Sequence, residues 1–159
     1  MSLGQRVASD GQLVRLLQIG VVLEEVVEAR AYEHSDTLSG LDASTETLLE
    51  EAAEESASHR ERLTALIDDL EANSVPFDRI QPLVAEHYEA DEGFDDVLYD
   101  QLCNEETAYK FYDDLIEAIE ASDVEFSIDR DRLLSELRAV RREEERGVEA
   151  VTALMENGE

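Results

Sequence analysis

Two ten-residue segments decide the fold that this sequence predicts: LEEVVEARAY at residues 23–32 and CNEETAYKFY at residues 103–112. Each segment has a Glu seven residues before a Tyr, and on a helix this spacing places both side chains on one face. The near repeat therefore predicts a helical pair that occurs twice in the chain.

Glu105, in the second segment, interrupts an apolar helical face. A helix turns by about 100° per residue, and the residues within about 60° of Glu105 are mostly large and apolar. The large apolar residues among them are Phe94, Leu98, Leu102, Tyr109, Tyr112, Ile116 and Ile119. A carboxylate in a core is costly unless a positive group meets it. Glu105 is thus expected to point into a core.

Helical periodicity extends over four long segments, and the sequence has few β-branched runs that would favour strands. We expect helices at about Asp10–Leu38, Ser44–Ala72, Glu92–Ala121 and Asp129–Glu156. Suitable N-cap residues are Ser9 or Asp10, Ser44 and Asp129. The predicted class is all-α.

The lengths of the connections predict how these helices are joined. Residues 39–43 and 122–128 are short connections, which join antiparallel neighbours. Residues 73–91 hold both prolines, and these 19 residues can extend over about 60 Å. A 28-residue helix is about 42 Å long, so this connector can cross the bundle, with a short helix predicted at Pro82–Ala90. The sequence predicts a four-helix bundle of two antiparallel hairpins joined by a long crossover, in one domain over residues 1–159 with a flexible N-terminus at 1–9.

The charge of the chain bears on its partners. It has 41 acidic and 13 basic residues, a formal net charge of −28. Such a charge repels nucleic-acid phosphates and anionic membrane surfaces, so we expect neither nucleic acid nor membrane as a partner. Lys110 is the one lysine beside twelve arginines. This acidic, lysine-poor composition resembles that of proteins from salt-loving organisms.

Hydropathy and cysteine content bear on location. No apolar run reaches the roughly 18 residues that span a bilayer, and no basic segment opens a signal peptide. We therefore expect a cytoplasmic protein. Cys103 stands alone, which excludes an intrachain disulfide and a cysteine-rich metal knuckle.

Polar residues interrupt the apolar stripe of each predicted helix near mid-length. The segment LTALI at 63–67 matches VTALM at 151–155, and this alignment pairs position 59 with position 147. The second stripe is Leu48, Ala52, Ser56, His59, Leu63, Leu66 and Leu70. The fourth is Leu133, Leu137, Val140, Glu144, Gly147, Val151 and Leu154. In the first helix, Glu25 and Glu28 lie beside Val14, Leu17, Val21 and Tyr32.

These residues resemble the ferritin-like superfamily, and rubrerythrin-type domains most closely, over roughly residues 10–154. In that family two helices each supply a Glu, and two others each supply a Glu-x-x-His pair, to a dimetal centre. The resemblance implies that Glu25, His59, Glu105 and Glu144 are metal ligands. Two family ligands are absent, because Ser56 and Gly147 stand where a Glu and a His are expected.

The resemblance implies iron or manganese as the metal, with iron oxidation or peroxide reduction as the activity. Carboxylates and imidazole suit both ions. Because the ligand set is incomplete, we expect one divalent ion, with a second held weakly by Glu55 or Glu143 and with Glu28 as another substitute. The hydroxyls of Tyr32 and Tyr112 are candidates to orient a ligand carboxylate.

A second hypothesis stays open beside the first. In a metal-free bundle, His59 and the Glu residues would hydrogen-bond one another or Arg146, and the protein would act as a helical interaction module. We expect a homodimer, because the first predicted helix is apolar on more than one side. The residues away from the Glu25 stripe are Leu16, Val22, Leu23, Val26 and Val27. Whether the protein is an enzyme is left open.

The charge generates a first prediction, which concerns salt. Folding should weaken markedly below roughly 0.1 M KCl, where the Debye length grows beyond about 10 Å and the surplus negative charges repel one another. Thermal melting over a series of KCl concentrations measures this. A melting temperature that does not change with salt would contradict the halophilic interpretation.

Overall fold

A computed structural model gives the fold, and it describes residues 7–37, 42–74, 76 and 97–157. Four long helices account for most of these residues: α1 (Asp10–Thr37), α2 (Ala43–Asp69), α4 (Val97–Glu120) and α5 (Arg130–Asn157). The all-α prediction is confirmed. Within the described ranges, no helix has an apolar stretch that could cross a lipid bilayer.

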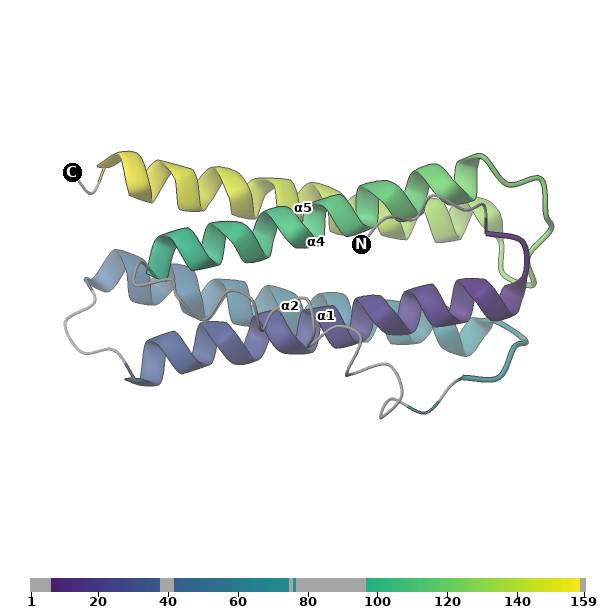
Figure 1. Cartoon of the computed structure of the whole chain (residues 1–159), viewed down its shortest axis with the longest axis horizontal. Helices are drawn as coiled ribbons and strands as arrows, with labels where there is room; N and C mark the ends of the chain where they lie inside the picture. Colours follow the sequence, from purple (N-terminus) through teal and green to yellow (C-terminus); the bar gives the residue numbers. More distant parts are fainter. Residues whose placement is uncertain (1–6, 38–41, 75, 77–96, 158–159) are drawn as a thin grey trace.

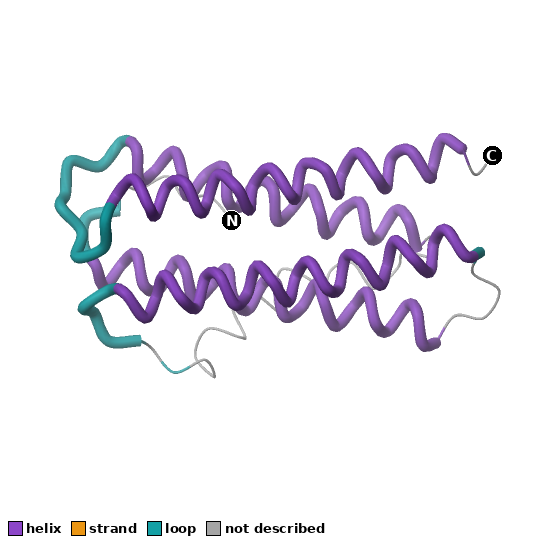
Figure 2. The backbone as a smooth tube through the Cα atoms, turned by 180° about the vertical axis from the view of Figure 1, so that it is seen from behind, coloured by secondary structure: helices purple, strands orange, loops and turns teal. Residues whose placement is uncertain are grey.

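The helices form two hairpins that pack into a four-helix bundle (Figure 1). Helix α1 packs mainly on α2 and α4 mainly on α5, and the hairpins meet through α1 with α4 and α2 with α5. Helices α2 and α4 run in the same direction, as Figures 1 and 2 both show. The predicted bundle of two antiparallel hairpins is thereby confirmed. Most of the expected crossover at 73–91, the short helix at 82–90 and the predicted helix start at Glu92 lie outside the described residues.

Local hydrogen bonds explain where the helices begin. The hydroxyl of Ser9 accepts a bond from the backbone N–H of Gln12, so Ser9 caps α1 as expected. Helix α2 begins earlier than predicted, because Asp42 and not Ser44 is its N-cap. The Asp42 backbone is extended, and its Oδ1 lies 2.7 Å from the backbone nitrogen of Thr45. A carboxylate here satisfies an otherwise unpaired N–H group.

The N-terminal segment is partly packed. Of the predicted flexible residues 1–9, the structure describes 7–9, and Val7 is buried in the main apolar core. The backbone carbonyl of Val7 accepts a hydrogen bond from the Ser122 hydroxyl at 2.6 Å, and Asp10 accepts one from the Ser127 N–H at 3.1 Å. These bonds hold the start of α1 against the connection between α4 and α5.

The core is divided along the length of the bundle. One large apolar cluster unites all four helices, and a much smaller one lies elsewhere in the bundle. The large cluster includes Leu13, Leu17, Leu63, Leu66, Leu115, Ile116, Leu133 and Leu137, and the small one is Ala31, Leu49 and Ala53. Full burial of each Leu or Ile stabilises the fold by about 1.5–3 kcal/mol. Between the two clusters the buried side chains are polar.

Charged pairs join the two hairpins where they meet. Asp100 of α4 is buried and accepts hydrogen bonds from the Arg30 guanidinium of α1. His34 Nε2 lies 2.7 Å from the same carboxylate. On the other side of the bundle, Arg62 of α2 donates to Glu136 and Glu143 of α5. Ion pairs thus join the two hairpins on two sides of the bundle, between α1 and α4 and between α2 and α5.

Candidate metal centre

His59 lies at the centre of the polar level, on α2, and its side chain is 0% exposed. Its Nδ1 lies 2.9 Å from Glu144 Oε1 and 3.3 Å from Glu24 Oε1, both fully or nearly buried. Its Nε2 faces two partly exposed carboxylates, Glu143 at 3.4 Å and Glu55 at 4.0 Å. The imidazole therefore has a buried pair of carboxylates on one side and a solvent-facing pair on the other.

A second group of carboxylates adjoins the first. Glu55, Glu105 and Glu144 each offer an oxygen within 4.8 Å of the other two, and so do the donor atoms of Glu24, His59 and Glu144. Glu144 belongs to both groups, and a hydrogen bond joins it to Glu105. The structure thus brings together three of the four predicted ligands, His59, Glu105 and Glu144.

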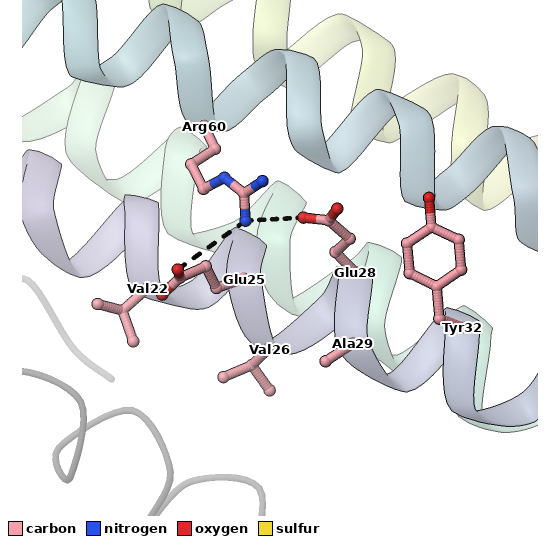
Figure 3. Close-up of a pocket in the computed structure, with 7 residues that line it drawn as sticks. All are labelled: Val22, Glu25, Val26, Glu28, Ala29, Tyr32 and Arg60. Atoms are coloured by element: carbon pink, nitrogen blue, oxygen red, sulfur yellow. Dashed lines mark ion pairs between the residues drawn. The ribbon is translucent and has the colours of Figure 1, made fainter.

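The fourth predicted ligand, Glu25, lies outside this cluster, and Glu24 takes its place. The Glu25 side chain is 51% exposed and its Oε1 lies 3.9 Å from Arg60 Nη1, whereas the Glu24 side chain is 0% exposed. Figure 3 shows Glu25 and Glu28 beside Arg60, with Tyr32 further along α1, in a pocket on the α1–α2 face. The placement that we predicted for Glu25 is therefore wrong.

The helical register explains the shift from Glu25 to Glu24. The buried face of α1 follows Val14, Leu17, Val21, Glu24 and Ala31, with successive steps of three, four, three and seven residues. This heptad spacing is the seam that packed helices bury. The repeated Glu and Tyr keep their common face, but in α1 that face points outward, and Tyr32 is 46% exposed. The heptad steps in the sequence would have predicted Glu24, whereas the alignment of the two repeats did not.

The three substitute ligands that the sequence suggested have different positions. Glu55 belongs to the cluster, with its side chain 34% exposed. Glu143 lies at the edge, 29% exposed, and Arg62 Nη1 lies within 3.0 Å of both of its oxygens. Glu28 lies outside, because its Oε2 is 2.8 Å from Arg60 Nη1. Arg62, and not Arg146, is the cation that borders the cluster.

Tyr112 of α4 supports the cluster from inside the core, as expected, whereas Tyr32 does not. The Tyr112 hydroxyl donates a hydrogen bond of 2.6 Å to Glu24 Oε1. The ring packs edge-on against His59, with centroids 6.4 Å apart. Burial raises the pKa of Tyr112 well above 10, and the charges of Glu24 and Glu144 add to this effect. The hydroxyl therefore remains a donor, and it fixes the position of the Glu24 carboxylate.

Glu24 and His59 form an ion pair in the metal-free protein. Burial alone would raise the pKa of Glu24, but the hydrogen bond and the charge of His59 lower it overall. Burial would likewise lower the pKa of His59, but the hydrogen bond and charge of Glu24, together with Glu55 and Glu143, raise it overall. Each partner thus stabilises the charged form of the other.

Three further carboxyl groups of the cluster, those of Glu144, Glu105 and Glu55, have raised pKa values. Burial raises the pKa of Glu144 well above 4.5, and the charges of Glu24 and Glu105 raise it further. Burial also raises the pKa of Glu105, although hydrogen bonds from Glu144 and Gln101 oppose it. Burial raises the pKa of Glu55 to about 7 against the opposing charge of His59. A bound cation would oppose these upward shifts, because it would stabilise the charged forms of the carboxyl groups.

The donor set fits divalent transition-metal ions. Two ligands about 2.1 Å from one ion and at right angles are about 3 Å apart, which is close to the distances from His59 Nδ1 to Glu144 and Glu24. Among the described residues, Glu24 Oε2 is buried and has no hydrogen-bond partner. A buried carboxylate oxygen without a partner is costly unless a cation or a donor meets it. The cluster therefore has the spacing of a metal centre and a buried carboxylate oxygen without a hydrogen-bond partner.

We compared the chain with protein-family models, with curated proteins and with solved structures, and none of them matches it. The resemblance to the ferritin-like superfamily therefore stays a prediction. The function must be argued from the cluster itself.

The raised pKa of Glu55 generates a prediction for the metal-free protein. The folded state holds this proton more tightly than the unfolded state, so its stabilising contribution is complete below pH 4.5 and is lost as the pH rises through about 7. The raised pKa of His59 also makes the stability fall as the pH rises, whereas the lowered pKa of Glu24 changes the stability only at lower pH. Melting temperatures in chelator and concentrated KCl should fall between pH 5 and pH 8, and Glu55→Gln should reduce the fall.

The matched control for this prediction is Glu54→Gln, which removes the neighbouring exposed carboxylate and should leave the pH profile as in the wild type. If the melting temperature falls equally between pH 5 and pH 8 in the wild type and in Glu55→Gln, the raised pKa of Glu55 is contradicted.

Proposed function

We propose that this protein binds two divalent iron or manganese ions in the middle of its bundle, and that it is a ferritin-like protein that oxidises ferrous iron or reduces peroxide. The observation that carries the proposal is the pair of ligand groups that share Glu144. Glu24 and His59 complete one group, and Glu55 and Glu105 complete the other. A carboxylate common to two neighbouring groups is the arrangement that bridges two cations.

The charge balance of the cluster supports the proposal. Five carboxyl groups lie around one imidazole, and Arg62 is the cation at the edge. Buried carboxylates need positive charge, since their transfer from water into a low-dielectric core is unfavourable. Two divalent ions would supply positive charge beside Glu105 and Glu144 and would neutralise the ligand charges.

The ligand types indicate the class of metal. Imidazole and carboxylates together suit Fe and Mn, whereas sites made for Mg or Ca use oxygen alone. Bound iron would supply one-electron chemistry: the oxidation of two ferrous ions to ferric ions would provide the two electrons that, with two protons, reduce one hydrogen peroxide to two water molecules. Glu55 and Glu143, each about a third exposed, form the side of the cluster that solvent reaches.

The cytoplasmic location and the homodimer also stay proposals. Of the apolar residues behind the dimer prediction, Val22, Leu23 and Val27 are buried in the core, and Leu16 and Val26 are partly buried against it. These five residues therefore contribute to the fold of the described chain, and the oligomeric state must be measured.

Metal retention tests the proposed function. The purified protein is exposed to Mn²⁺, to Zn²⁺ or, without oxygen, to Fe²⁺ in concentrated KCl, and weakly held ions are removed before elemental analysis. The wild type should retain up to two ions per chain. His59→Ala and Glu24→Gln should reduce retention by at least about tenfold, because each removes a buried donor.

Glu25→Gln is the matched control for Glu24→Gln, because it makes the same change from carboxylate to amide at the adjacent, exposed position. It should retain metal as the wild type does. A wild type that retains no ion, or a His59→Ala variant that retains as much, would contradict the proposal. It would favour the metal-free interaction module, for which His59→Leu should be at least as stable as the wild type.

A further inference from the structure

Gly147, in the middle of α5, lies directly against the carboxyl group of Glu105 from α4. A Cβ atom at position 147 would be 2.5 Å from Glu105 Oε2, 2.6 Å from its Cδ and 3.0 Å from its Oε1. These three atoms are the nearest neighbours of such a Cβ, and all belong to one carboxyl group. A side chain at position 147 and the Glu105 carboxyl group therefore compete for the same space.

A glycine inside a helix requires an explanation, because glycine is less favourable there than alanine. Helix α5 continues for ten residues beyond Gly147, so the glycine does not serve as a C-terminal cap. Gly20 in α1 is also close-packed, but its neighbours are the apolar side chains of Leu63 and Phe111. Gly147 differs, because the group that fills its space belongs to the candidate metal centre.

The Glu105 carboxyl group is held from two sides. The backbone at Gly147 contacts it on one side, and Gln101 Nε2 donates a hydrogen bond of 3.0 Å to Glu105 Oε1 on the other. In this position it joins Glu55 and Glu144. Helices α4 and α5 are neighbours in one hairpin (Figure 2), so the approach of Glu105 to α5 is limited by the side chain at 147.

We propose that Gly147 is a positioning residue that makes the two halves of the centre chemically different. Without a side chain at 147, Glu105 can complete a subsite with Glu55 and Glu144 that has oxygen donors only, whereas the other half includes the His59 nitrogen. This inference rests on the proposed function. Sites with oxygen donors only suit Mn²⁺, whereas sites that include an imidazole suit Zn²⁺. The half with His59 should therefore prefer Zn²⁺, and the half with Glu105 should prefer Mn²⁺.

The test uses Zn²⁺ and Mn²⁺ together. One equivalent of Zn²⁺ is bound first, and Mn²⁺ is then titrated while the electron paramagnetic resonance signal of free Mn²⁺ is followed. The wild type should hold one Zn²⁺ and one Mn²⁺ per chain. Gly147→Ala should keep the Zn²⁺ and lose Mn²⁺ affinity by at least about tenfold. Gly11→Ala, where the nearest atoms are 3.8 Å away, is the control and should keep both ions.

Two results of the titration would overturn the inference. Mn²⁺ binding by Gly147→Ala that is as tight as in the wild type would show that Glu105 does not need the space. A loss of both ions in that variant would show a general effect on the bundle, because a positioning role for Glu105 affects one half of the centre.

A metal-free experiment separates this inference from the proposed function. In chelator, Gly147→Ala should raise the melting temperature when Glu105 is also replaced by Ala, because helix propensity then acts without a steric conflict. In the presence of Glu105 the rise should be smaller by about 2–4 °C. Equal shifts in both backgrounds would overturn the inference. A wild type that binds neither ion would contradict the proposed function, and the melting temperatures would still decide the role of Gly147.

Discussion

The main constraint on the structure is the mutual repulsion of the carboxyl groups around Glu144, which must be compensated inside the bundle. Glu24, Glu105 and Glu144 are all buried at one level of the bundle, and their negative charges cannot coexist there without compensation. In the metal-free protein, the raised pKa values of Glu144 and Glu105 and the ion pair of Glu24 with His59 reduce that repulsion. Such a level adds little stability by itself, because the same volume filled with Leu would bury more apolar surface. Its presence between two apolar clusters therefore needs a functional reason.

Each hairpin supplies part of this level. Glu24, Glu55 and His59 come from the α1–α2 hairpin, and Glu105 and Glu144 come from the α4–α5 hairpin. The hairpins meet through fewer helix contacts than those within each hairpin, so a cation shared by Glu144 and Glu24 would join them directly. Under the proposed function, metal binding and docking of the hairpins are therefore coupled, since an ion that binds only the folded bundle stabilises it.

The sequence predicted the helices and hairpins well, because long amphipathic periods and short connections are local signals. It also predicted that His59, Glu105 and Glu144 face one another, since each interrupts an apolar stripe. It failed at Glu25, because two adjacent Glu residues differ by only about 100° on a helix and the repeat alignment selected the wrong one. The role of the Gly147 backbone could not be predicted either. It depends on how closely α4 approaches α5, which no local pattern specifies.

Anomalous X-ray diffraction from crystals of the manganese-loaded protein tests the central claim most directly. A metal centre built on Glu144 predicts anomalous density beside this carboxylate, inside the bundle and next to His59. Density confined to partly exposed acidic groups such as Asp113, Asp114 and Glu117, with none beside Glu144, would contradict it.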